Sequence, residues 1–297
     1  MMLTKQIVLF LVLFLTTACS KPENIQVDKL NIGIVSYDSS DRSIEKYSGL
    51  KTHLGTELKS VIELEPTYNE VQALRRISSK KWDLVFAPSG LAAIAVDRHN
   101  YQPMMPLEGI NNNRSVIVVS QDAKFQNRRD LAGEVIALGQ VGSATGYYLP
   151  IYNLYGLAFA EILFAPTAKV GMSWVKEGKV AATALSLEDF NRYRKQLGAK
   201  KFRVLYLDEH EIPSGAIVLS ENIERFQQEQ IIKTLTNSPS HVAASAQFLK
   251  NEELPNYDYL IKVIKRVESI SANIDQKPAQ FYLNKQSQLP VESKSNS

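Results

Sequence analysis

Residues 139–150, GQVGSATGYYLP, place three glycines and two hydroxyl side chains between an apolar run and an expected helix. Glycine lets the backbone turn tightly and approach a ligand closely. The first amides of a helix have no acceptor within the helix and lie at its positive end, so they attract anions. Hydroxyls of Ser143 and Thr145 could donate further hydrogen bonds. The stretch therefore predicts an oxyanion-binding loop, although a plain turn with a Ser or Thr N-cap has the same composition.

Two other loops could face the same ligand. Ser36 and Tyr37 come directly after the first expected strand, and Ser89 follows the third. The carboxyl ends of strands in an open α/β sheet border the ligand cleft. Ser36 and Ser89 could donate to an anion, and Tyr37 could offer a phenol or an aromatic face. Each of them could equally be an ordinary turn residue.

Other kinds of chemistry have little support in the sequence. The four histidines are scattered, and the single cysteine, Cys19, precedes any plausible fold, so no zinc-ligand pattern is present. No nucleophile and base occur at a known motif spacing. The 34 basic and 31 acidic side chains nearly balance, whereas nucleic-acid binding requires a strongly basic face. We expect no catalysis, no metal, no cofactor and no nucleic-acid partner.

Alternating apolar and amphipathic segments predict the elements that hold these loops. A first series has strands 30–35, 61–65 and 82–87 with helices 43–58 and 70–79. A second series has strands 134–138, 179–185 and 202–207 with helices 144–155 and 187–197. Lone strands 115–120 and 215–219 follow the two series, and helices 223–235 and 259–270 end the fold. This order favours an α/β fold of two lobes, each a mostly parallel sheet flanked by helices, connected by two crossover strands.

The N-terminus predicts export from the cytoplasm. Residues 1–18 carry one lysine followed by the apolar run 7–15, which is too short to span a bilayer but fits a signal peptide. Cys19 follows small residues in a pattern that resembles the lipobox of bacterial lipoproteins, whose cysteine is acylated. The alternative is an ordinary secretory signal with an incidental cysteine. Lipidation would anchor the chain to the membrane on its periplasmic or extracytoplasmic side.

The rest of the chain divides into five parts. We expect a tether at 19–28, the N-terminal part of lobe 1 at 29–118 and an inserted lobe 2 at 119–212. Residues 213–271 then return to lobe 1 and form the C-terminal helices. The polar residues 272–297 are expected to be a disordered tail.

Several motifs recur in an order that resembles a known family. They are LNIGIVSY at 30–37, YNEVQAL at 68–74, WDLVFAP at 82–88, RSVIVV at 114–119, DLAG at 130–133, GSATGY at 142–147 with Pro150, and IPSGAIV at 212–218. Together they resemble the phosphate/phosphite/phosphonate-binding lipoproteins of ABC importers over about residues 30–223. The resemblance implies a type II periplasmic-binding-protein fold, whose lobes close on a ligand, and an ABC permease as partner.

The resemblance also implies ligand contacts at Tyr37 and in the loop at 142–146. The full set that we predict is Ser36, Tyr37, Ser89, Gly142, Ser143, Ala144, Thr145, Gly146 and Tyr147. Ala144 stands where the family has a hydroxyl, the family's Gly-Ser-His lacks its histidine here, and Glu188 could be its acidic residue. We expect a monomer that captures a small oxyanion similar to phosphonate, phosphite or phosphate, with a different or larger anion left open. The alternatives are a ligand-binding partner of a membrane kinase and an enzyme on the same fold.

Overall fold

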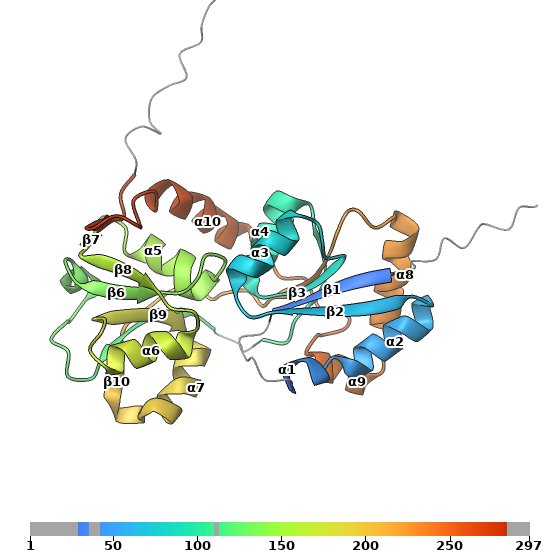
Figure 1. Cartoon of the computed structure of the whole chain (residues 1–297), viewed down its shortest axis with the longest axis horizontal. Helices are drawn as coiled ribbons and strands as arrows, with labels where there is room; N and C mark the ends of the chain where they lie inside the picture. Colours follow the sequence, from blue (N-terminus) through green and yellow to red (C-terminus); the bar gives the residue numbers. More distant parts are fainter. Residues whose placement is uncertain (1–28, 36–41, 110–112, 284–297) are drawn as a thin grey trace, which may run out of the picture.

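The computed structural model describes residues 29–35, 42–109 and 113–283 (Figure 1). The chain forms two lobes, each built on a five-stranded sheet. The expected signal peptide, Cys19, Ser36 and Tyr37 lie outside the described residues. Within the described ranges, no helix has both the length and the apolar character needed to cross a membrane.

Lobe 1 has the sheet order β2-β1-β3-β11-β4. Its strands are β1 (Lys29–Val35), β2 (Val61–Thr67), β3 (Leu84–Ala87), β4 (Gln102–Pro106) and β11 (Ala216–Leu219). The first three are parallel, and β11 runs antiparallel to β3 and β4. One face packs on α2 (Ser48–Leu58), α8 (Arg225–Thr236) and α9 (Ser240–Ala246), with the short α1 (Arg42–Glu45) beside them. The other face packs on α3 (Glu70–Ser78) and α4 (Ser89–His99).

Lobe 2 has the sheet order β10-β5-β9-β6-β8. Its strands are β5 (Ser115–Ser120), β6 (Val135–Leu138), β8 (Glu161–Phe164), β9 (Ala182–Ser186) and β10 (Phe202–Leu207). Strand β6 runs parallel to β8 and β9, while β5 runs antiparallel to β9 and β10. One face packs on α6 (Ala168–Lys176) and α7 (Leu187–Leu197). The other packs on the π-helical turn η3 (Ala144–Tyr148) and α5 (Leu149–Asn153), and short 3-10 turns lie at η2 (Arg128–Leu131) and η4 (Ala199–Lys201).

The lone strands predicted at 115–120 and 215–219 correspond to β5 and β11, and each is a full member of one sheet. The predicted boundary between lobe 1 and lobe 2 after residue 118 is therefore wrong. A boundary after residue 118 would cut β5, which lies inside the lobe 2 sheet between β10 and β9. Its Val116 and Val118 are completely buried under the lobe 2 helices, and this burial fixes the strand in that lobe. The chain passes from lobe 1 to lobe 2 between β4 and β5 and returns between β10 and β11.

The prediction of a disordered tail from residue 272 onward is wrong, because described structure continues to residue 283. Strand β12 (Ala279–Gln280) pairs with β7 (Ala158–Phe159) of lobe 2. Phe281 is fully buried, and its ring centroid lies 5.2 Å from that of Phe159. Burial of an aromatic pair holds this segment on lobe 2 in spite of its polar composition. Residues 284–297 lie outside the described part of the chain.

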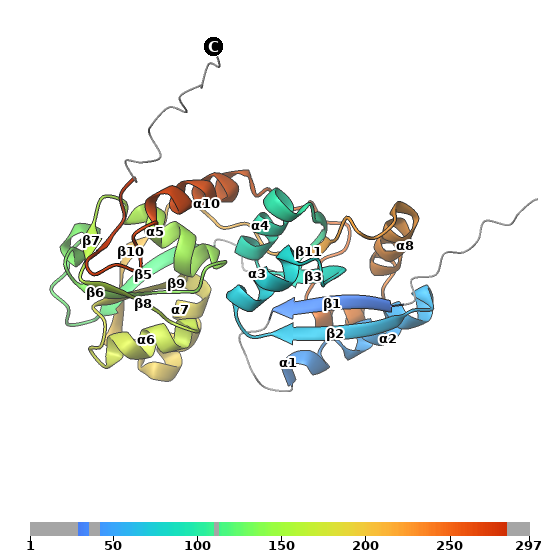
Figure 2. The ribbon, with the colours of Figure 1, turned by 45° about the horizontal axis from the view of Figure 1, so that its top comes forward.

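Helix α10 (Asp258–Ile270) belongs to both lobes, rather than to lobe 1 alone as expected. It lies along one side of the molecule, over α5 and next to α4 (Figure 2). Its apolar stripe, with Val263 and Val267 buried, joins the core that runs through both lobes. Lys265 forms an ion pair with Asp97 of α4 at 2.6 Å. The helix therefore packs on elements of both lobes.

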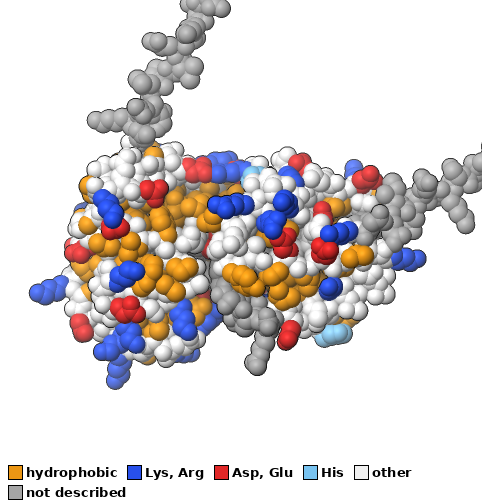
Figure 3. Space-filling model, in the orientation of Figure 1, with side chains coloured by type: hydrophobic (Ala, Val, Ile, Leu, Met, Phe, Trp, Pro, Cys, Tyr) orange, Lys and Arg blue, Asp and Glu red, His pale blue; other side chains and the backbone are white. Residues whose placement is uncertain are grey.

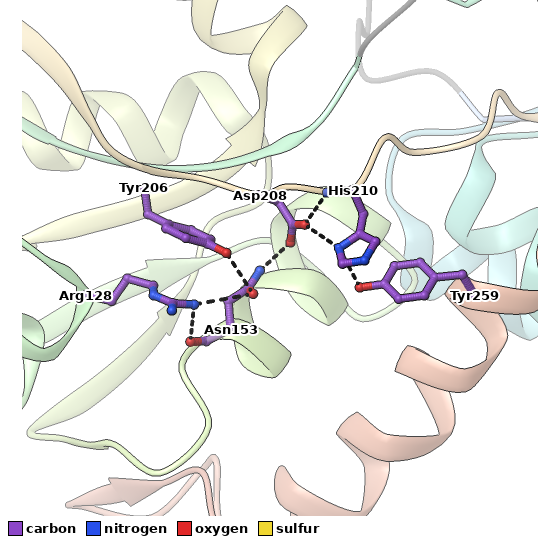
Figure 4. A network of polar contacts seen from close by, with 6 residues as sticks. All are labelled: Arg128, Asn153, Tyr206, Asp208, His210 and Tyr259. Atoms are coloured by element: carbon purple, nitrogen blue, oxygen red, sulfur yellow. Dashed lines mark hydrogen bonds and ion pairs between the residues drawn. The ribbon is translucent and has the colours of Figure 1, made fainter.

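The second crossover starts in a buried polar network (Figure 4). Asp208 is 1% exposed and accepts hydrogen bonds from the backbone N–H of His210 at 2.8 Å and from Asn153 of α5. The ring of His210 stacks on Tyr259 of α10 with centroids 4.2 Å apart. The Tyr259 hydroxyl lies 3.0 Å from His210 Nδ1. The carboxylate thus joins the crossover to α5, and through His210 to α10.

We expect Asp208→Ala to lower the free energy of unfolding by about 1–3 kcal/mol. The change removes the acceptor of two partly buried hydrogen bonds, from the Asn153 side chain and from the His210 backbone N–H. Chemical denaturation of the purified chain measures the loss. Glu209→Ala is the matched control, because that neighbouring carboxylate is exposed and its removal is expected to change stability by less than about 0.5 kcal/mol. Equal stabilities of the two variants would contradict a structural role for Asp208.

Candidate functional site

A cavity of about 380 Å³ lies between the lobes. The residues that end or follow five strands line it: Val35 at the end of β1, Pro88 after β3, Gly139 after β6, Ala165 after β8 and Ser186 at the end of β9. These are the carboxyl ends of parallel strands, where the sequence placed the cleft. Both lobes therefore contribute loops and helix starts to a single cavity.

The glycine loop, residues 139–146, is held as a closed ring. Pro150 has no N–H and cannot bond the carbonyl of Gly146 four residues earlier, as an α-helix would require. That carbonyl instead accepts from Gly139 N–H at 2.8 Å, across the loop. The N–H groups of Tyr148 and Leu149 bond five residues back, which gives a π-helical turn. The proline thus explains how the ring closes and why the helix starts with this turn.

Side-chain hydroxyls fix the loop on both sides. Ser143 caps the turn, since its Oγ accepts from Gly146 N–H at 3.1 Å. Ser115 at the start of β5 donates to the Thr145 carbonyl at 2.7 Å. The N–H groups of Ala144 and Thr145 find no acceptor among the residues that the structure describes. These amides, together with the hydrogen of the Ser143 hydroxyl and the Thr145 hydroxyl, are available to a ligand.

Three further helices begin at the cavity. Helix α4 starts at Ser89, α6 is capped by Thr167 and α7 is capped by Ser186, and all three residues line the cavity. Thr167 accepts from Val170 N–H at 3.3 Å, and Ser186 accepts from Asp189 N–H at 3.0 Å. Each helix start carries partial positive charge, so the four together favour an anion in the space between them.

The charged side chains of the cavity wall are two cations and four carboxylates: Lys46, Arg192, Glu70, Glu108, Glu188 and Asp189. Arg192 of α7 lies 2.7 Å from Glu188 and 3.7 Å from Asp189. Burial raises the pKa of Asp189, whose carboxylate also accepts from the Ser186 hydroxyl at 2.9 Å. Glu188, predicted as a candidate acidic residue, does line the cavity. Attraction for an anion comes from the backbone amides and from Lys46, which also lines the cavity. On the face shown in Figure 3, basic and acidic side chains are likewise interspersed.

Most of the predicted site residues line the cavity, and one does not. Ser89, Gly142, Ser143, Ala144, Thr145 and Gly146 are all in its wall. Tyr147 is outside it, 6% exposed, with its ring 5.0 Å from that of Tyr148 and 6.2 Å from that of Phe164. The reason is that the turn of η3 points Tyr147 into the core, where burial raises its pKa. Tyr147 therefore does not line the cavity, contrary to its predicted role as a ligand contact.

Sequence reasoning missed several residues of the wall. Thr167 begins α6, a helix that was not expected, and Thr183 lines the cavity from β9. Lys46 and Tyr47 reach it from the turn between α1 and α2. A detectable signal existed for Thr167, because a threonine after Pro166 and before an apolar periodic stretch is a common N-cap. Lys46 and Tyr47 carry no such local signal.

The comparison with solved structures supports the fold. A binding protein component of an ABC phosphonate transporter from Pseudomonas aeruginosa is 17% identical, with a TM-score of 0.64 over 82% of this chain and 86% of that one. PhnD1 from Prochlorococcus marinus in complex with methylphosphonate is 16% identical, with a TM-score of 0.65 over 81% and 98%. XAC2383 from Xanthomonas citri is 16% identical, with a TM-score of 0.66 over 81% and 99%. The fold is that of the type II periplasmic-binding proteins, as the motifs implied.

A search of curated protein sequences gave no match. A sequence profile of one family, described as "ABC transporter, phosphonate, periplasmic substrate-binding protein", matches residues 32–252. This range includes both sheets, the glycine loop and the starts of α4, α6 and α7. The chain belongs to the family of periplasmic substrate-binding proteins of phosphonate ABC transporters.

Proposed function

We propose that this chain captures a small phosphorus oxyanion, of the phosphonate, phosphite or phosphate type, in the cavity between its lobes. Membership of the family makes it a solute-binding component of an ABC importer that works outside the cytoplasm. The observation that carries the choice of ligand is the glycine loop, whose amides at Ala144 and Thr145 have no acceptor among the described residues. PhnD1 was solved with methylphosphonate, and we extend that ligand class to this chain as part of the proposal.

The cavity suits a tetrahedral oxyanion for two physical reasons. Its donors come from four helix starts on both lobes, so they surround a ligand instead of contacting one side. The donors of the glycine loop are also preorganised, because the closed ring at 139–146 holds them in place before the ligand arrives. Preorganised donors lose little conformational entropy on binding. We place Ser89, Ser143 and Thr145 at the ligand as hydroxyl donors.

Capture requires motion of the lobes but no bond chemistry. The connections from β4 to β5 and from β10 to β11, which join the lobes, are where a hinge would act. The family serves transport and is not a family of enzymes. We propose further that the chain acts as a monomer, presents its ligand to the permease and releases it unchanged. Mass spectrometry of methylphosphonate after long incubation with the protein should show no product.

Calorimetry with the full chain tests the ligand class. Methylphosphonate, phosphite and phosphate are titrated separately, with methanesulfonate as a sulfur oxyanion for comparison. We expect saturable binding of at least one phosphorus oxyanion, because the amides of the glycine loop match its oxygens. If none of the three binds, the proposed function is contradicted. Tighter binding of methanesulfonate would instead assign a sulfonate ligand.

Thr145→Ala is expected to weaken that binding by about 1–2 kcal/mol, which corresponds to roughly 5- to 30-fold in Kd. The reason is the loss of one hydroxyl donor from the cavity wall. Calorimetry on the anion that wild type binds most tightly measures the change. Thr52→Ala is the matched control, since Thr52 is exposed on α2 and bonds only the Ser48 carbonyl. Affinity unaltered by Thr145→Ala would remove Thr145 from the site.

We also propose that the mature chain is lipid-anchored through Cys19. Cells that express the full chain should incorporate labelled palmitate into the protein, and the protein should partition into detergent. Cys19→Ser is expected to abolish both, because it removes the thiol that would carry the acyl group. Labelling that persists in the Cys19→Ser variant would place the lipid elsewhere, and an unlabelled wild-type chain would favour an ordinary secretory signal.

A further inference from the structure

One carboxylate in the wall of the cavity lies directly against the glycine loop. Glu70 is the first residue of α3, lines the cavity and is only 5% exposed. A Cβ built on Gly142 would lie 2.7 Å from Glu70 Cβ and 3.4 Å from Glu70 Cγ, so this side chain packs on that glycine. The donors that we assign to the oxyanion belong to the next three residues of the loop, 143–145. A buried acidic side chain therefore lies beside the proposed place of a negatively charged ligand.

The cations of the wall do not explain this arrangement. Arg192 forms ion pairs with Glu188 and Asp189 of its own helix. Lys46 donates a hydrogen bond from Nζ to the side-chain oxygen of Gln247. The wall as a whole has more carboxylates than cations. Two negative groups that share a buried site are unfavourable unless one of them carries a proton.

The chemistry of the ligand decides where that proton resides. Glu70 is in the first turn of α3, and a helix start favours the negative form of a carboxyl group. An ionised carboxylate accepts several hydrogen bonds and donates none. The monoanion of a phosphonate, a phosphite or a phosphate keeps at least one P–OH group, which donates, while its charged oxygens accept. A sulfonate of the same shape and charge has no such hydrogen. Glu70 therefore complements the first class of ligand and repels the second.

We infer that Glu70 determines specificity: its carboxylate accepts the hydrogen bond of a P–OH group, so the cavity selects singly charged phosphorus oxyanions over sulfonates. The inference rests on the proposed function, because the glycine loop must hold the oxyanion next to Glu70. The amides of Ala144 and Thr145 then bind charged oxygens of the ligand, and Glu70 binds the protonated one. Loop and carboxylate thus recognise different oxygens of one molecule.

Calorimetry with methylphosphonate and methanesulfonate tests the inference on the full chain. The pH is mildly acidic, so that methylphosphonate keeps its P–OH group and both ligands carry a single charge. We expect wild type to bind methylphosphonate at least about tenfold more tightly than methanesulfonate, because only the first can donate to Glu70. This comparison needs no variant.

The variant Glu70→Gln keeps the shape of the side chain but adds an NH₂ donor. It should bind methylphosphonate at least about tenfold more weakly than wild type and methanesulfonate more tightly than wild type. The gain of methanesulfonate binding also shows that the variant is folded. A second variant, Glu70→Ala, removes the acceptor without adding a donor and should weaken only methylphosphonate. Glu57→Gln is the matched control, because it removes an exposed charge of α2 outside the cavity wall and should keep the wild-type preference.

Equal affinities of wild type for methylphosphonate and methanesulfonate would overturn the inference and leave the proposed function intact. Wild-type preference in both Glu70→Gln and Glu70→Ala would do the same. Aminomethylphosphonate gives a further check. If the Glu70 variants weaken its binding but not that of methylphosphonate, Glu70 contacts an ammonium group and the inference is wrong. If wild type binds none of methylphosphonate, phosphite and phosphate, the proposed function fails as well.

Discussion

The structure depends on main-chain amides that have no partner at the starts of helices. An unpaired N–H is costly to bury, so it must meet water or a ligand. Here the starts of η3, α4, α6 and α7 surround one cavity, and the amides of Ala144 and Thr145 face it without an acceptor among the described residues. Neighbouring residues of the loop and the sheet hold these amides in place. Pro150 closes the loop, Ser143 caps it, and Ser115 ties it to the sheet.

The distribution of apolar residues explains why two lobes can move while remaining one molecule. The cores of the two sheets are separate on the faces covered by α2 and by α6. On the opposite faces they merge through α4, α5 and α10 into a continuous cluster. The contacts of His210 with Tyr259 and the ion pair between Lys265 and Asp97 attach α10 to the second crossover and to α4 on this shared side.

Sequence reasoning found the sheets and the glycine loop because their signals are local. Apolar strands such as β1 and β6, and glycines next to hydroxyls, can be read from a few neighbouring residues. The assignment of β5 to lobe 2 could not be read in this way, because it depends on the long-range pairing with β9 and β10. Strand β4 was missed because it contains two prolines. Proline is found mainly in edge strands, and β4 lies at the edge of the lobe 1 sheet. Tyr147 was misplaced because its direction depends on a π-helical turn.

The glycine loop, whose closure follows from the missing N–H of Pro150, affects how far the sequences of such proteins can diverge. A ligand held by main-chain groups depends on the path of the backbone and only weakly on which side chains decorate it. In the proposed site, the side chain of Ala144 contributes no donor, whereas its main-chain N–H does. Solved structures at 16–17% identity share the fold at TM-scores of 0.64–0.66, which is compatible with this dependence on the backbone. At Gly142, whose φ is 109°, and at Pro150, which has no N–H, the backbone geometry itself limits which residue types fit.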